Sequence, residues 1–93
     1  MRAIQKISIT NPPDRTKIIL SLPKNSTILD AELFDNEFIF WFDGVADEHV
    51  GFDVHTVGIF RPEEAIPDTA TIFIGTVKPY IENGFLFEYV KPV

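Results

Sequence analysis

Several residue types are absent or scarce in this chain, and each absence excludes a class of chemistry. There is no cysteine, which excludes disulfides, thiolate metal sites, iron–sulfur clusters and thiol catalysis. The five glycines are scattered, so no glycine-rich loop is present to hold a phosphate group. The longest apolar run, Phe38–Phe42, is far shorter than the roughly 20 residues that span a bilayer. With polar Gln5 and Lys6 near the start in place of a secretory signal, we expect a cytoplasmic protein.

Between frequent glycines and prolines, the chain is rich in Ile, Val, Phe and Thr, which is typical of short strands. The sequence therefore predicts an all-β fold, a compact single-domain antiparallel sandwich or small barrel of about six to seven strands over residues 1–93. The expected strands are Ile4–Thr10, Thr16–Leu22, Thr27–Leu33, Glu37–Phe42, His49–Val57, Thr71–Val77 and Phe85–Val90.

Turn residues separate these strands. Asp35–Asn36 predicts a tight reversal, Asp43–Gly44 a hairpin or bulge, and Asn83–Gly84 a hairpin. The longest stretch without strand character, Phe60–Thr69, could hold one helical turn at Pro62–Ala65, because proline suits the first helical position.

Acidic residues outnumber basic ones by 14 to 8, which gives a net charge of −6. The charge is uneven: residues 1–29 hold five basic residues and one acid, whereas residues 30–68 hold eleven acids and Arg61. This pattern disfavours direct binding of nucleic acid and favours a protein partner with a basic or nucleic-acid-binding surface. Nothing in the pattern indicates a membrane partner, and self-association is left open.

The segment around the two histidines is a candidate chemical site. Alternation along a strand would place His49, Asp53 and His55 on one face, with Val50, Phe52 and Val54 facing the core. Asp53 and His55 could then bind a metal or act as acid and base with a neighbouring carboxylate. The alternative is a solvated outer face, which we favour, and we expect no metal and no cofactor. The neighbouring carboxylates are Asp43, Asp47 and Glu48.

Catalytic nucleophiles are poorly supported, since no Gly-x-Ser-x-Gly motif is present and Ser8, Ser21 and Ser26 have no histidine near them in sequence. We therefore expect no enzymatic activity.

The aromatic segment Glu37–Asp43 is apolar on both faces of a strand. Phe38, Phe40 and Phe42 lie on one face, and Ile39 and Trp41 lie on the other. One face must be core, while the second is either buried as well or awaits a partner. If it is exposed, Trp41 would anchor a binding surface with a charged rim. The expected binding residues are Trp41, Asp43, Asp47, Glu48 and Asp53.

Short motifs along nearly the whole chain resemble a family of small uncharacterised proteins of phages and prophages. They are Met1–Lys6, Leu22–Pro23 followed by Thr27–Leu29, Phe40–Asp43, Thr56–Gly58, Ile66–Pro67, Phe73–Thr76 and Gly84–Phe87. The chain departs from that family where relatives tend to carry histidines, at Ile59 and at Glu88–Tyr89. The resemblance implies a phage context, hence the host cytoplasm, and no particular activity.

These observations lead to one main functional hypothesis and two alternatives. The main one is a phage-encoded accessory or host-defence-inhibiting protein that binds a partner through an acidic and aromatic surface. The first alternative is a structural, virion-associated protein that assembles through an exposed strand edge. The second is a small-ligand or metal-binding protein that uses Asp53 and His55.

Overall fold

The computed structural model of the chain describes residues 1–10, 12, 16–46, 49–78 and 83–90. It contains seven strands, and none of their ends differs by more than three residues from the prediction. The strands are β1 (Arg2–Thr10), β2 (Lys17–Pro23), β3 (Thr27–Phe34), β4 (Glu37–Val45), β5 (Phe52–Phe60), β6 (Ala70–Val77) and β7 (Gly84–Tyr89).

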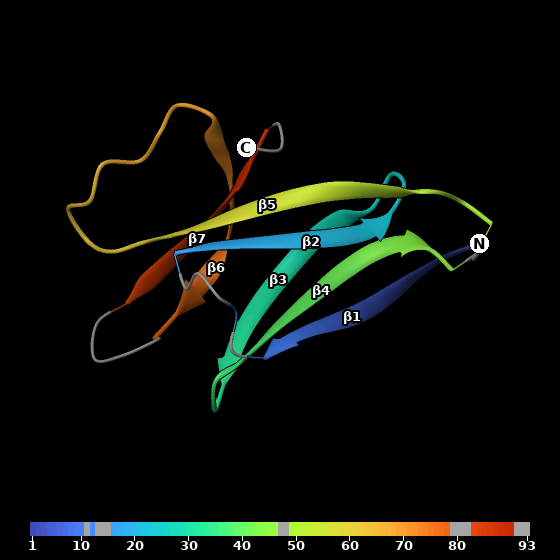
Figure 1. The fold of residues 1–93 in the computed structure, drawn as a ribbon, viewed down its shortest axis with the longest axis horizontal. Helices are drawn as coiled ribbons and strands as arrows, with labels where there is room; N and C mark the ends of the chain where they lie inside the picture. The colour runs from blue at the N-terminus through green and yellow to red at the C-terminus, as the bar shows by residue number, and fades with distance from the viewer. Residues whose placement is uncertain (11, 13–15, 47–48, 79–82, 91–93) are drawn as a thin grey trace.

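The strands form two sheets, sheet A with the order β1-β4-β3 and sheet B with the order β2-β5-β7-β6. Every strand pair is antiparallel. In Figure 1, β2 and β5 cross in front of β3 and β4, so the sheets lie one over the other. The predicted all-β antiparallel fold is confirmed, in its sandwich form.

The core lies between the two sheets. Phe38, Phe40 and Phe42 of β4 are at most 5% exposed and pack against aliphatic residues of both sheets. Burial of one such side chain contributes about 1.5–3 kcal/mol. The prediction that one face of the aromatic segment is core is therefore confirmed. The core residues are Ile18, Leu20, Leu22, Ile28, Ala31, Phe38, Phe40, Phe42, Val57, Ile59, Ile74, Val77 and Leu86.

The hairpin between β3 and β4 turns at Asp35–Asn36, as predicted. Phe34 pairs with Glu37, and both turn residues have positive φ, 60° and 85°. Positive φ at both central residues defines a type I′ turn, whose twist matches that of the flanking strands. Asp and Asn tolerate this conformation better than other residues that carry a Cβ.

The two predicted turns that contain glycine, Asp43–Gly44 and Asn83–Gly84, differ from the prediction in the structure. Asp43–Gly44 is not a turn, because both residues lie within β4 and pair with β1. The hairpin between β6 and β7 does form, but Val77 already pairs with Gly84. Gly84 is therefore the first residue of β7, and the connection is the longer stretch 78–83.

The long connection between β5 and β6 does not contain the helical turn that the sequence allowed at Pro62–Ala65. The N–H of Glu64 donates to the carbonyl of Arg61 at 3.1 Å, and Glu63 has a φ of 69°. Positive φ after proline is typical of a type II turn, which explains the proline without a helix.

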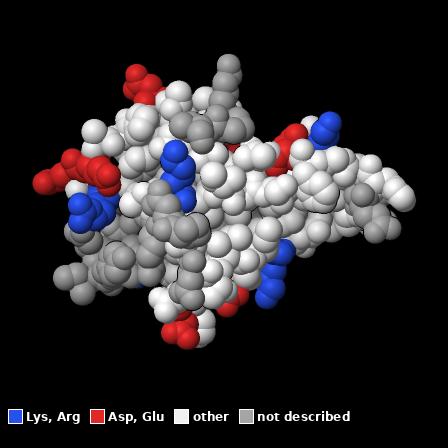
Figure 2. Space-filling model, viewed as in Figure 1, with Lys and Arg blue, Asp and Glu red and all other residues white. Residues whose placement is uncertain are grey.

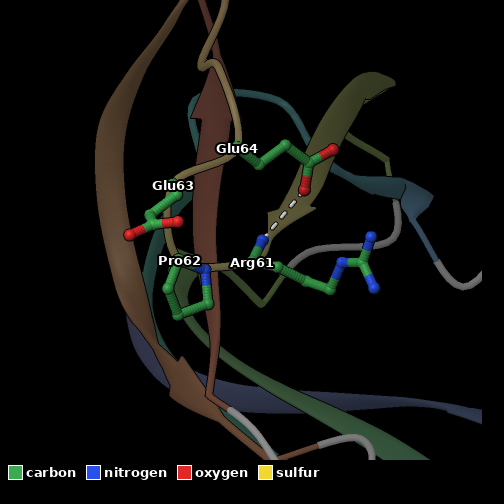
Figure 3. A pocket seen from close by; sticks show the side chains of 4 residues that line it. All are labelled: Arg61, Pro62, Glu63 and Glu64. Atoms are coloured by element: carbon green, nitrogen blue, oxygen red, sulfur yellow. Dashed lines mark hydrogen bonds between the residues drawn. The ribbon is translucent and has the colours of Figure 1, made fainter.

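Figure 3 shows this turn around a hollow of about 400 Å³, with the carboxylates of Glu63 and Glu64 pointing apart. They do not form a shared site.

Candidate protein-binding surface

His55 faces the inside of the sandwich, which reverses the predicted orientation of β5. It lies directly opposite Leu20, whose side chain is 1% exposed, and residues opposite each other in an antiparallel pair share a face. Phe52 and Val54 consequently face outward and are 62% and 49% exposed. The alternation along the strand was predicted correctly, but the side that faces solvent was wrong.

The carboxylate next to His55 is Glu88 of β7, which sequence reasoning missed. Nδ1 of His55 lies 2.5 Å from Oε2 of Glu88, and each side chain is 13% exposed. Asp53 lies on the same side of β5 as His55 but is exposed, and it accepts a long hydrogen bond from the N–H of Asn25 at 3.4 Å. Asp53 and His55 therefore stay on one side of β5 and border the same hollow, but the carboxylate that His55 contacts belongs to a residue 33 positions away.

The space beside this pair is a hollow of about 300 Å³ where β7 ends next to β5; it is lined by Asp53, Val54, His55, Glu88, Tyr89 and Val90. Nε2 of His55 is buried and has no hydrogen-bond partner among the residues that the structure describes. A ligand in the hollow could not reach that nitrogen without moving neighbouring atoms. Within the described residues, no three His, Asp or Glu side chains come together as metal ligands do.

Trp41 and Asp43 do lie together, on the outer face of sheet A. Their charged neighbours come from β1: Lys6 Nζ lies 5.7 Å from the centre of the Trp41 ring, and Arg2 forms a two-point ion pair with Asp43. The hydrogen bond from Arg2 lowers the pKa of Asp43, against an opposing contribution from burial. Asp43 is thus compensated within the molecule and is not a free acid awaiting a basic partner.

We expect the Asp43 carboxyl to titrate below the usual range for aspartate, which is about 3.9. Because its folded-state pKa is depressed, the stability it contributes is present above the unfolded-state pKa and is lost as pH falls through the folded-state pKa. An NMR titration of the side-chain carboxyl carbon should show an Arg2→Gln variant titrating at higher pH. If the Asp43 midpoint does not move in that variant, the ion pair does not exist in solution.

The structure does not gather the predicted acidic surface as a whole. Asp53 lies on β5 of sheet B, away from the sheet that carries Trp41 and Asp43. Asp47 and Glu48 lie outside the described residues. On the face in Figure 2, acidic and basic side chains are interspersed at several places and form no single acidic patch.

The outer face of sheet B is instead an apolar surface, here called the aromatic face. Phe60 and Phe73 meet Phe87 edge to face, with ring centres 6.1 and 5.4 Å apart. Strand pairing places Phe85 beside Phe60 and Ile19 beside Thr56 on the same side. Its members are Ile19, Phe52, Val54, Phe60, Phe73, Phe85, Phe87 and Tyr89.

Much of the aromatic face is open to solvent. Ile19 is 60% and Phe73 54% exposed, in addition to Phe52 and Val54. Of the strand residues that point to this side, Lys17 is the one with a charge. Figure 2 shows an uncharged surface over the middle of β2 and β5.

A signal for this face was present in the sequence. Phe85, Leu86 and Phe87 are consecutive, so β7 is apolar on both sides, and Ile72, Phe73 and Ile74 give the same indication for β6. A two-layer sandwich needs one apolar face per strand. Apolar residues on both faces of neighbouring strands therefore indicate an apolar outer face in addition to the core.

Comparison of the chain with protein-family models, with curated proteins and with solved structures finds no match. None of the described residues belongs to a helix that could cross a membrane.

Proposed function

We propose that this protein is a non-enzymatic binding module that holds a protein partner on its aromatic face. The observation that carries the proposal is an outer sheet face with six aromatic side chains and a single charge, on which Phe52 and Phe73 are more than half exposed. With about half of each side chain open, Ile19, Phe52, Val54 and Phe73 together offer on the order of 400 Å² of apolar surface. Ile19, Phe52 and Val54 lie toward one end of the sheet and Phe73 lies level with Gly58, so this area is divided between two places on the face. Exposed apolar surface of this kind is often functional.

The aromatic face suits binding because its central rings are already fixed in place. Phe60 is 7% exposed and contacts Phe87, which in turn contacts Phe73. Rings held in this way lose little conformational freedom when a partner covers them. Aromatic side chains are also the residues that most often dominate binding energy at protein interfaces.

The charge distribution limits the chemistry of the partner. An apolar partner surface must meet the aromatic face, because a charge buried there would find no opposite charge except near Lys17. Around that contact, the net charge of −6 favours a partner with basic surroundings, which would be attracted over a longer range. The partner we propose is therefore a protein with an apolar patch and a basic rim. A phage accessory role is supported by the sequence resemblance alone.

The proposal can be tested by panning a random peptide display library on the purified protein. Binders to the wild type should lose affinity about 10-fold or more for the double variant Ile19→Thr/Val54→Thr, because buried apolar side chains contribute about 1.5–3 kcal/mol each. Both replacements are β-branched and keep strand propensity. Fluorescence anisotropy of the selected peptides measures the affinities, and circular dichroism confirms that the variant is folded.

The matched control removes similar apolar side chains from the opposite sheet. Ile4→Thr/Phe34→Thr alters residues that are 70% and 74% exposed on the outer face of sheet A. The peptides should bind this variant like the wild type. Loss of binding in the control alone would assign recognition to the Trp41 side of the molecule and would refute the aromatic face as the binding surface.

A further inference from the structure

The strand β1 presents an open edge of sheet A. It runs for nine residues in continuous register with β4, from Arg2 opposite Val45 to Thr10 opposite Glu37, and contains no bulge and no proline. Figure 1 shows it at the outside of the sheet. Among the described strands, β4 is the one that pairs with β1. Its other edge therefore offers a row of backbone donors and acceptors to an incoming strand.

The remaining sheet edges are less suited to pairing. β3 and β6 lie against each other and both contain register shifts. The contact is close: a Cβ at Gly75 of β6 would lie 3.5 Å from the carbonyl oxygen of Ala31. β2 ends in a proline, Pro23, and its inward side chains are already at most 2% exposed. Bulges, prolines and a covering segment are the usual ways in which proteins block edge pairing.

β1 has none of these protections, and its inward side chains stay partly open. Ile7 and Ile9 pack against the core but are only partly buried. Its two basic side chains already have partners within the molecule: Lys6 lies over the Trp41 ring, and Arg2 forms an ion pair with Asp43. The edge therefore does not require an acidic strand as its partner, and an apolar strand of the same kind would cover both isoleucines.

We propose that β1 pairs antiparallel with β1 of a second copy, with a two-fold axis at Ile7, to form a continuous six-stranded sheet. Opposite residues must share a face, which limits the allowed registers. An axis at Ile7 places Ile7 against its own copy and Lys6 against Ser8. An axis at Lys6 would oppose two lysines, and one at Ile4 would oppose Arg2 and Lys6, which like-charge repulsion disfavours. An axis at Gln5 would leave Ile9 outside the paired residues, and one at Ser8 would shorten the pairing to residues 6–10, because β1 ends at Thr10. The proposed dimer contact lies on sheet A, whereas the aromatic face lies on sheet B. The dimer proposal therefore does not depend on the proposed function.

Replacing Ser8, an exposed residue, tests both the partner and the register. In the proposed dimer, Ser8→Glu faces Lys6 of the other copy and should lower the dimer dissociation constant, whereas Ser8→Lys should raise it. Each substitution acts at two symmetric positions of the dimer. We therefore expect the dissociation constant to change by about 3- to 10-fold in each direction. Net charge alone predicts the opposite order, because Ser8→Glu makes each copy more acidic.

Sedimentation equilibrium from about 10 µM to 1 mM measures these dissociation constants. The edge is short compared with a standard interface of about 1,600 Å², so we expect a weak dimer, strengthened by salt that screens the net charge. Ser21→Glu and Ser21→Lys on β2 are matched controls and should change the constant little. A monomeric wild type at 1 mM, or Ser8 variants in the reverse order, would overturn the proposal. A dimer weakened by Ile19→Thr/Val54→Thr but insensitive to Ser8 would also overturn it.

Discussion

Replacing Phe40 with alanine is expected to remove a large part of the protein's stability. The side chain is 0% exposed and lies in the middle of β4, opposite Ile7 on one side and Ala31 on the other. Removing a buried phenylalanine costs about 3–5 kcal/mol, since the cavity cannot fully collapse. The total free energy of unfolding of a small domain is roughly 5–15 kcal/mol. Thermal and urea unfolding followed by circular dichroism should show a Tm lowered by about 15 °C or more.

Phe34→Ala is the matched control, because it removes the same side chain from a site that is 74% exposed. Its free energy of unfolding should stay within about 0.5 kcal/mol of the wild type. If Phe40→Ala does not fold, Phe40→Leu should still unfold measurably earlier than Phe34→Ala, because leucine fills most of the volume but not all of it. Equal stability of the Phe34 and Phe40 variants would contradict the arrangement of the core.

The strands were predictable because their signals are local. Alternation of side chains and turn residues can be recognised within a few positions, and the Asp35–Asn36 reversal is an example. The order of strands within each sheet was not predictable in this way. The chain passes from sheet A to sheet B after β1, returns after β2, and crosses again after β4. These crossings depend on contacts between residues far apart in the sequence.

The reversed face of β5 has a local cause. In the first half of the segment the apolar residues are at even positions, as in Phe52 and Val54, while in the second half Val57 and Ile59 take odd positions. Both halves cannot face the core at once. The structure turns Val57 and Ile59 into the core and exposes Phe52 and Val54. A prediction based on the first half of the segment alone therefore assigned the wrong side of β5 to the solvent.

The candidate sites depended still more on distant residues. No pattern near His55 indicates Glu88, because pairing of β5 with β7 brings them together. Likewise, Arg2 compensates Asp43 only because β1 lies beside β4. The uneven charge along the sequence was real, but strand pairing mixes the basic first third with the acidic middle. A linear charge pattern therefore overstated the acidic surface.

Gly58→Ala is expected to destabilise the protein by about 1–3 kcal/mol, which is typical of overpacking. Gly58 lies on the aromatic face, where a Cβ would sit 2.8 Å from two atoms of the Phe60 ring and 3.1 Å from the Tyr89 ring. Rings of this kind cannot bend aside as a flexible chain can. One or both must leave the strand surface, and urea unfolding measures the cost.

The matched control is Gly51→Ala, where the added Cβ would meet only the flexible Lys24 side chain, at 3.2 Å from Cε. We expect its stability to remain within about 0.5 kcal/mol of the wild type. The comparison bears on function, because Gly58 allows the rings of Phe60 and Tyr89 to lie close to the β5 backbone and hold the aromatic face in one arrangement. Equal stability of the two variants would mean that these rings are loose. The aromatic face would then have to order itself at the moment of binding, with a lower affinity.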